Sequence, residues 1–214
     1  MYISMNKCVE LNGGRPFKGC IHIGAHLGEE AQAYASAGVR NVLWVEANPK
    51  LMKPLYDNTR DVSVKSKYFN AVITDVDNEE VELKIANNGQ SSSIFEFGTH
   101  ATMYPHVQYV DRIKMKSKRF DTLYKENIVD VDIDLYDFIN LDIQGAELKA
   151  LKSFGNLFEN VNFKAIYTEI NLEEVYKGCA LLSEIEEFLD EKGFKKVAVS
   201  GESHAWGDCL FLKK

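Results

Sequence analysis

The chain of 214 residues is 45% hydrophobic and 27% charged, with a formal net charge of −7. Length and composition indicate a globular protein with a full-sized core, and the acidic balance disfavours nucleic acid as a partner, because nucleic-acid binders usually carry a basic patch. No apolar run approaches the roughly 20 residues that span a bilayer, and the first residues do not resemble a signal peptide. We therefore expect a cytoplasmic protein with no membrane partner.

The cysteines and the one dense basic stretch give little sign of a metal or nucleic-acid site. The four cysteines are scattered and form no Cys-x-x-Cys pair, so reduced thiols are expected rather than disulfides or a zinc site. The basic residues in KMKSKRF, at 114–120, alternate along the chain. This alternation is typical of the solvated face of a strand.

The first part of the chain alternates between strand-like and helix-like patterns. Gly38 is a stop signal for the first helix, and Asn48 and Pro49 are start signals for the second. This β-α-β-α-β order with short connections predicts a parallel, doubly wound sheet. Strands are expected at 20–24, 41–47 and 67–73, and helices at 29–38 and 48–60.

The middle of the chain has strand-like segments with no long helix between them. We interpret it as a β-rich insertion around 80–117 that carries a mobile loop, GTHATMYPH, at 98–106. Strands in this insertion are expected at 81–86, 92–97 and 107–115.

The α/β rhythm returns after the insertion. Strands are expected at 136–142 and 162–170, helices at 145–158 and 181–193, and a closing antiparallel pair at 194–200 and 208–214. The predicted fold is thus a Rossmann-like, mostly parallel seven-stranded sheet with an antiparallel C-terminal strand. We expect a single domain over 1–214, with 1–19 as an N-terminal extension.

The segment CIHIGAHLGEE (20–30) contains the first expected strand and the turn after it, and this turn has the features of a ligand-binding site. Gly24 and Gly28 would place backbone N–H groups and a helix N-terminus at the carboxyl end of the sheet. Glu46 ends the second strand about 20 residues further on, as a ribose-binding carboxylate does. The pattern indicates an adenosine-type cofactor, although the GxGxxG motif of NAD-binding proteins is not met. The alternative is a tight strand–helix turn beside a surface glutamate.

Five segments together resemble the FkbM family of S-adenosylmethionine (SAM)-dependent methyltransferases. They are HIGAHLG (22–28), VLWVEANP (42–49), DIQGAE (142–147), TEIN (168–171) and DCLFLK (208–213). The resemblance extends from Cys20 to the C-terminus. The chain departs from the family pattern at His22, where the family usually has an acid, at His26, where it has Asn, and at Gln144, where it often has Glu.

The resemblance implies SAM contacts at the glycine turn, at the ends of three strands and in a serine-containing segment. The alternative for His22 is a strand-end histidine that bonds to the backbone, and the alternative for the serines at 91–93 is a polar turn. The expected cofactor-binding residues are His22, Gly24, Ala25, His26, Gly28, Glu46, Ala47, Asn70, Ala71, Ser92 and Asp142.

The family also implies O-methylation, and a hydroxyl needs a base or a metal ion to remove its proton. Asp142 is the candidate base, orienting group or Mg²⁺ ligand, because it ends a strand at the ligand-binding edge. Glu169 and His26 are the other catalytic candidates, with a structural ion pair as the alternative for Glu169. Glu147 is either a first-turn glutamate favoured by the helix dipole or a metal ligand.

The acceptor is expected to be a hydroxyl of a small molecule, a sugar or a glycan residue. His100, Tyr104, Gln144 and His204 are the expected substrate-binding residues. Trp206 lies near His204 and faces either a sugar or a packed hairpin. Two alternative functions stay open on the sequence alone. One is an NAD-dependent sugar dehydrogenase or epimerase, and the other is a non-catalytic SAM-binding module.

Overall fold

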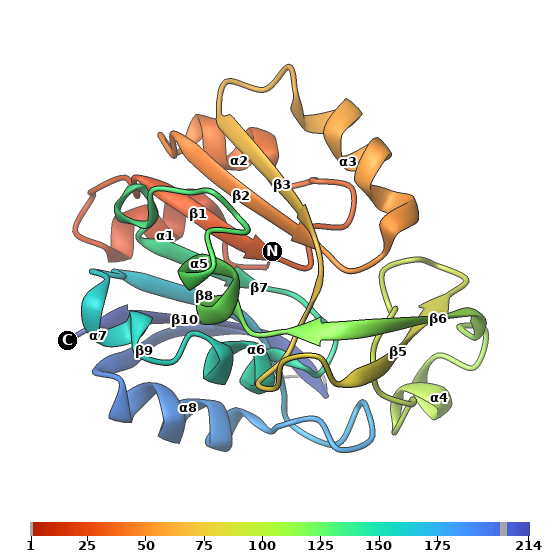
Figure 1. Ribbon diagram of the computed structural model, residues 1–214. Coiled ribbons are helices and arrows are strands. Elements are labelled where there is room, and N and C mark those ends of the chain that lie inside the picture. The colour runs from red at the N-terminus through yellow and green to blue at the C-terminus, as the bar shows by residue number, and fades with distance from the viewer. Residues whose placement is uncertain (1, 202–204) are drawn as a thin grey trace.

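Seven strands form the main sheet in the computed structural model, which describes residues 2–201 and 205–214 (Figure 1). Their order across the sheet is β3-β2-β1-β7-β8-β10-β9. The first five run parallel, and β10 is antiparallel to both of its neighbours. This confirms the predicted sheet and its antiparallel C-terminal strand. The strands are β1 (Gly19–Ile23), β2 (Asn41–Glu46), β3 (Lys65–Asn70), β7 (Phe138–Leu141), β8 (Ala165–Asn171), β9 (Phe194–Ser200) and β10 (Trp206–Lys213).

Helices cover both faces of this sheet, so it is doubly wound as predicted. Because side chains alternate along a strand, Ile21 and Ile23 of β1 pack in one core with the later helices, and Cys20 packs in the other core with the first three. In the described part of the chain no helix is both long and apolar enough to cross a membrane. One face carries α1 (Met5–Leu11), α2 (Ala31–Ser36) and α3 (Met52–Thr59); the other carries α5 (Phe120–Lys125), α6 (Glu147–Ser153), α7 (Leu157–Asn160) and α8 (Leu182–Glu191). Two 3₁₀ turns are η1 (Pro49–Leu51) and η2 (Ile133–Leu135).

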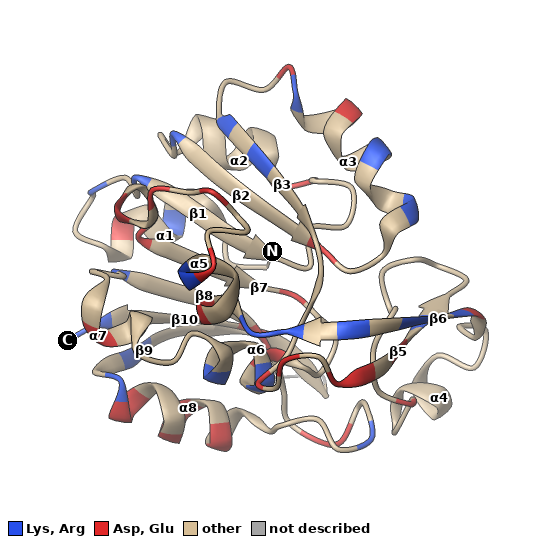
Figure 2. Cartoon of the chain, in the orientation of Figure 1, with Lys and Arg blue, Asp and Glu red and all other residues tan. Residues whose placement is uncertain are grey.

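The middle of the chain forms a second sheet, which confirms the β-rich insertion. Strand β6 lies between β4, which runs parallel to it, and β5, which runs antiparallel. Lys114 and Lys116 of β6 are exposed, in agreement with the solvated strand face expected there. Figure 2 shows the basic residues of this strand in blue. The elements are β4 (Val72–Ile73), β5 (Glu80–Ala86), β6 (Tyr109–Lys118) and a short helix α4 (His100–Met103).

Four local expectations differ from the structure. The segment 92–97 is not a strand, because only Ser93 and Phe97 make isolated bridges, to Lys84 and Tyr176 respectively. The strand expected at 67–73 is divided between the two sheets as β3 and β4. The helix expected at 145–158 is broken into α6 and α7, since Gly155 between them has a positive φ of 48°. The predicted loop at 98–106 contains α4.

The turns that follow β1 and β7 are packed directly against each other. Gly24 has a φ of 91°, and a Cβ atom there would lie 1.8 Å from the carbonyl oxygen of Asp142. At Gly28 a Cβ atom would lie 2.3 Å from a methyl group of Thr59 in α3. Both glycines are therefore required by the packing of the chain on itself.

The turn between β7 and α6 is held by the buried carboxylate of Glu147. Its Oε1 atom accepts hydrogen bonds from the backbone N–H groups of Ile143 (3.0 Å) and Gly145 (3.1 Å). Burial raises the pKa of Glu147 to about 7 in spite of these bonds. Glu147 lies in the first turn of α6, as one of its two interpretations expected, and it also supports the backbone that carries Asp142.

Replacing Leu151 by alanine is expected to destabilise the fold. Leu151 is fully buried in the core that Ile21 and Ile23 form with the later helices. Leu151→Ala should therefore lower the free energy of unfolding by about 2–5 kcal/mol in denaturant titrations. The matched change Leu172→Ala, at a position 38% exposed, should cost about 0.5 kcal/mol or less. Equal losses in the two variants would contradict the assignment of the core.

Glu147→Gln is expected to change how stability depends on pH. The folded protein binds a proton at Glu147 more tightly than the unfolded chain does. Protonation of Glu147 therefore stabilises the fold fully below pH 4.5, and this stabilisation is lost as the pH rises through about 7. The variant lacks this loss and should gain stability relative to the wild type over that range, as measured by denaturant titrations at several pH values. Glu187→Gln on the exposed surface should follow the wild-type profile. If stability depended on pH in the same way in all three proteins, the raised pKa of Glu147 would be refuted.

Candidate active site

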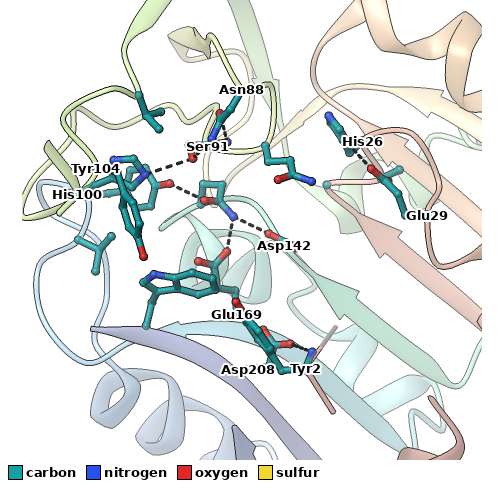
Figure 3. Close-up of a pocket in the computed structure, with 18 of the residues that line it drawn as sticks. Tyr2, His26, Glu29, Asn88, Ser91, His100, Tyr104, Asp142, Glu169 and Asp208 are labelled. Atoms are coloured by element: carbon teal, nitrogen blue, oxygen red, sulfur yellow. Dashed lines mark hydrogen bonds and ion pairs between the residues drawn. The ribbon is translucent and has the colours of Figure 1, made fainter. Parts of the chain in front are cut away.

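Two adjoining cavities lie where the carboxyl ends of β1, β2, β7 and β8 meet. The larger has a volume of about 550 Å³ (Figure 3) and the smaller about 80 Å³. Most of the predicted site residues line one or both, whereas Gly28 and Asn70 line neither and His204 lies outside the described residues. The larger cavity is lined by His22, Gly24, Ala25, His26, His100, Tyr104, Asp142, Gln144 and Glu169, and the smaller by Gly24, His26, Glu46, Ala47, Ala71, Ser92, Asp142 and Gln144.

The smaller cavity combines one fixed carboxylate with apolar walls. Glu46 is only 8% exposed, and its two oxygens accept hydrogen bonds from the backbone N–H groups of His26 (2.8 Å) and Asn48 (2.7 Å). Burial raises the pKa of Glu46. The apolar lining includes Leu51, Ala71, Leu83 and Ile143. A carboxylate held beside an apolar slot can bind a ribose diol next to a flat base.

Asn70 and Gly28 line neither cavity, and each contacts the chain near the site. The side-chain amide of Asn70 donates to the carbonyl oxygens of Glu46 (2.8 Å) and Ala47 (3.0 Å). It therefore fixes the end of β2, while Gly28 allows the close approach of Thr59. Their direct contact with a cofactor stays a prediction.

His26 occupies the glycine turn in a left-handed conformation, with a φ of 45°. Its Nδ1 atom lies 2.7 Å from Oε1 of Glu29, and this hydrogen bond raises the pKa of His26. A Cβ atom on Gly89 would lie 3.1 Å from Nε2 of His26, so the loop after β5 packs over the ring. The imidazole thus lies at the border between the two cavities, which it helps to line.

His22 belongs to a buried polar and aromatic group. Its Nδ1 atom lies 3.1 Å from the hydroxyl of Tyr34, and its ring centroid lies 5.3 Å from that of Trp44. Asn140 of β7 donates to the hydroxyl of Tyr34 at 2.6 Å. Burial lowers the pKa of His22, so the neutral imidazole is favoured. Asn140 was not among the predicted site residues, although its position as a polar residue inside the apolar run YDFINLD was a signal for it.

Asp142, Gln144 and Glu169 form one hydrogen-bonded group at the junction of the cavities (Figure 3). The side-chain amide nitrogen of Gln144 donates to Oδ1 of Asp142 (2.7 Å) and to Oε2 of Glu169. The hydroxyl of Tyr176 donates to the side-chain oxygen of Gln144. Burial raises the pKa of Glu169 well above its usual range, and the nearby carboxylates of Asp142 and Glu147 add to this shift. Asp142 itself is exposed to the cavity.

His100 is buried although the sequence places it in an expected loop. Its ring stacks on Phe97 with a centroid distance of 4.2 Å, and Nε2 lies 3.2 Å from the hydroxyl of Ser91. Burial lowers its pKa. Tyr104 lies beside it, with ring centroids 5.1 Å apart. These residues form the wall of the larger cavity opposite the glycine turn.

The far end of the larger cavity contains residues from both termini. The backbone N–H of Tyr2 donates to Oδ2 of Asp208 at 2.6 Å, and the hydroxyl of Tyr167 donates to the same carboxylate. The rings of Tyr2 and Trp206 lie 5.5 Å apart. Sequence reasoning missed Tyr2 and Tyr176, and no local pattern points to either. Trp206 does line the cavity, as one of its two sequence interpretations required.

The serine segment is hydrogen-bonded to nearby residues and to the turn after β7. Ser92 donates to the carbonyl of Gly89 (2.7 Å) and accepts from the N–H of Ala86 (3.1 Å). Ser93 donates to the carbonyl of Gln144 at 2.7 Å. The predicted cofactor contact of Ser92 is compatible with its place in the smaller cavity wall.

The donor set does not fit the Mg²⁺ ion considered from the sequence. Within residues 2–201 and 205–214, no group of three or more His, Cys, Asp or Glu side chains is placed to hold a metal ion. The amide of Gln144 stands between Asp142 and Glu169, where a bridging cation would have to bind.

Solved structures show the same fold at low sequence identity. Magnesium protoporphyrin IX methyltransferase from Synechocystis PCC 6803 with bound SAM is 10% identical, with a TM-score of 0.54 over 98% of this chain and 76% of that one. The methyltransferase domain of bacterial CtHen1-C is 8% identical, with a TM-score of 0.53 over 99% and 97%.

The family comparison is more specific. No curated protein matches the sequence. The model of the methyltransferase FkbM domain matches residues 22–196, which is most of the chain. The protein therefore belongs to the FkbM methyltransferase family.

Proposed function

We propose that this methyltransferase uses SAM to methylate a hydroxyl group of a small molecule, a sugar or a glycan residue. The observation that carries the proposal is the position of Asp142, which lines both cavities and is oriented by Gln144. The smaller cavity suits the adenosine part of the cofactor, and the larger cavity suits the acceptor. Family membership favours this function over the alternative of an NAD-dependent dehydrogenase.

The chain's own residues fit the adenosine part of SAM. Each oxygen of Glu46 accepts one backbone hydrogen bond and keeps capacity to accept a second from a ribose hydroxyl. Ala71 and Leu83 supply apolar contact for the adenine ring. Because backbone hydrogen bonds already hold Glu46, little side-chain entropy is lost when the diol binds.

Asp142 is the proposed base for methyl transfer. When bound, SAM supplies a methyl group on a positively charged sulfur atom. A neutral hydroxyl is a weak nucleophile, so Asp142 would accept its proton as the new oxygen–carbon bond forms and the sulfur–carbon bond breaks. Gln144 occupies Oδ1 of Asp142, which leaves Oδ2 for the proton. Glu169 is a poorer base at this step, since its raised pKa favours the protonated form.

The lining of the larger cavity supports an uncharged, hydroxyl-bearing acceptor. Tyr2, Tyr104 and Trp206 present aromatic rings, and Asp208 adds a carboxylate. Neither lysine nor arginine occurs among the described residues that line this cavity. Phosphate groups are usually bound by such cations, so the site is unsuited to nucleic acid. Aromatic rings with carboxylates provide apolar contact and hydrogen bonds for a sugar. The single domain over 1–214 and the cytoplasmic location are part of this proposal.

Glu46→Ala is expected to weaken SAM binding by about 1–3 kcal/mol, the contribution of hydrogen bonds to a charged group. Calorimetric titration with SAM, its demethylated product and NAD measures this change, and the wild type should bind the first two and not NAD. Glu187→Ala, on the exposed side of α8, should bind like the wild type. Unchanged affinity in Glu46→Ala would remove Glu46 from the cofactor site.

Asp142→Ala is expected to abolish methyl transfer while SAM affinity stays close to that of the wild type. The assay combines methyl-labelled SAM with a panel of hydroxyl compounds, and labelled product is identified by mass spectrometry. A loss of SAM affinity as large as the loss of rate would contradict the role as base. A wild-type protein that binds SAM but methylates no member of a broad panel would instead support a non-catalytic SAM-binding module.

A further inference from the structure

Both ends of the Gln144 side-chain amide have hydrogen-bond partners in the site. Its amide nitrogen donates to both Asp142 and Glu169, and its side-chain oxygen accepts from Tyr176. The reverse amide orientation would place the oxygen of Gln144 against the Asp142 carboxylate and remove the acceptor for Tyr176. The hydrogen-bonded neighbours therefore determine which end of the amide faces the carboxylates.

Three separate parts of the chain hold Gln144 in place. Ser93 donates to its backbone carbonyl at 2.7 Å, Tyr176 contacts its side chain, and Glu169 belongs to β8. The residue has a φ of 55°, a left-handed conformation that a glutamine rarely adopts. Such a conformation persists where the surroundings fix it. The contacts of Gln144 thus restrain it in the gap between the carboxylates.

A carboxylate in place of the Gln144 amide would add a negative charge beside Asp142 and Glu169. A glutamate at 144, the residue that the FkbM pattern often has, would bring a third carboxylate to Asp142 and Glu169. Carboxylates at hydrogen-bonding distance repel one another unless a proton or a cation joins them. Three carboxylates supply the hard oxygen ligands that Mg²⁺ and Mn²⁺ prefer. The glutamine side chain is as long as that of glutamate and carries no negative charge.

We infer that Gln144 is a positioning residue that takes the place of a divalent cation, so that Asp142 is held toward the acceptor without a metal ion. Its two N–H groups join Asp142 and Glu169 as a bridging cation would. The inference rests on the proposed function for the role of Asp142. Its main test does not, because it measures cation binding and needs no acceptor.

The test compares wild type, Gln144→Glu and Gln144→Ala by titration with Mn²⁺ alone, followed by calorimetry and by the electron paramagnetic resonance of the ion. Gln144→Glu should bind Mn²⁺ at least about tenfold more tightly than the other two proteins. This binding should be lost in the double variant that also carries Asp142→Asn. Because a bound cation stabilises the folded state, Mn²⁺ should also raise the thermal midpoint of Gln144→Glu and leave that of the wild type unchanged.

Two results would overturn the inference. One is tight Mn²⁺ binding by the wild type that disappears in Asp142→Asn, a measurement that requires no change at 144. The other is a Gln144→Glu protein that folds, as judged by binding of the demethylated product of SAM, yet binds Mn²⁺ no better than the wild type.

A kinetic readout separates positioning from a purely structural role. In the methyl-transfer assay, Gln144→Ala should lose at least about tenfold in kcat with little change in SAM affinity, and Mn²⁺ should stimulate Gln144→Glu alone. Chelation of metal ions should not affect the wild type. If the wild type methylates nothing, the proposed function fails, while the Mn²⁺ titrations still decide the inference about Gln144.

Discussion

The close contact between the turns after β1 and β7 is the constraint on which the site depends. The backbone of Gly24 lies so near the carbonyl of Asp142 that even a methyl group would not fit. Because β1 and β7 are neighbours in the sheet, this contact places His26 and Asp142 on the two sides of one junction. The cavities that meet there share Gly24, His26, Asp142 and Gln144 as lining residues. Under the proposed function, the cofactor and the acceptor would meet at this point of the sheet.

The site contains several buried carboxylates, and each is stabilised by N–H or O–H donors rather than by lysine or arginine. Backbone N–H groups satisfy Glu46 and Glu147, a side-chain amide satisfies Glu169, and a tyrosine hydroxyl with the N–H of Tyr2 satisfies Asp208. Neutral donors reduce the cost of burying a charge without cancelling it. The larger cavity consequently keeps an acidic character, because its lining includes Asp142, Glu169 and Asp208.

The three departures from the FkbM pattern all have identifiable partners. His26 adopts the left-handed conformation that histidine, like asparagine, tolerates better than most residues. His22 joins Tyr34 in a buried hydrogen-bonded group, and Gln144 joins two carboxylates. These contacts are what a working site requires, since buried polar groups without partners are destabilising. Each of the three substituted side chains therefore has a hydrogen-bond partner within the folded chain.

The sequence by itself determined the parallel sheet and the polar residues at its carboxyl edge, because period-two patterns and strand ends are local properties of the chain. It misjudged 92–97 and 145–158, where apolar runs read equally well as other elements until packing decided between them. Only the tertiary structure brought Tyr2 to Asp208, which is 206 residues away, and Tyr176 to Gln144. Contacts between distant segments depend on how the elements pack, and no local pattern encodes them. For that reason the sequence located Asp142 and Glu46, whereas the fold alone revealed what surrounds them.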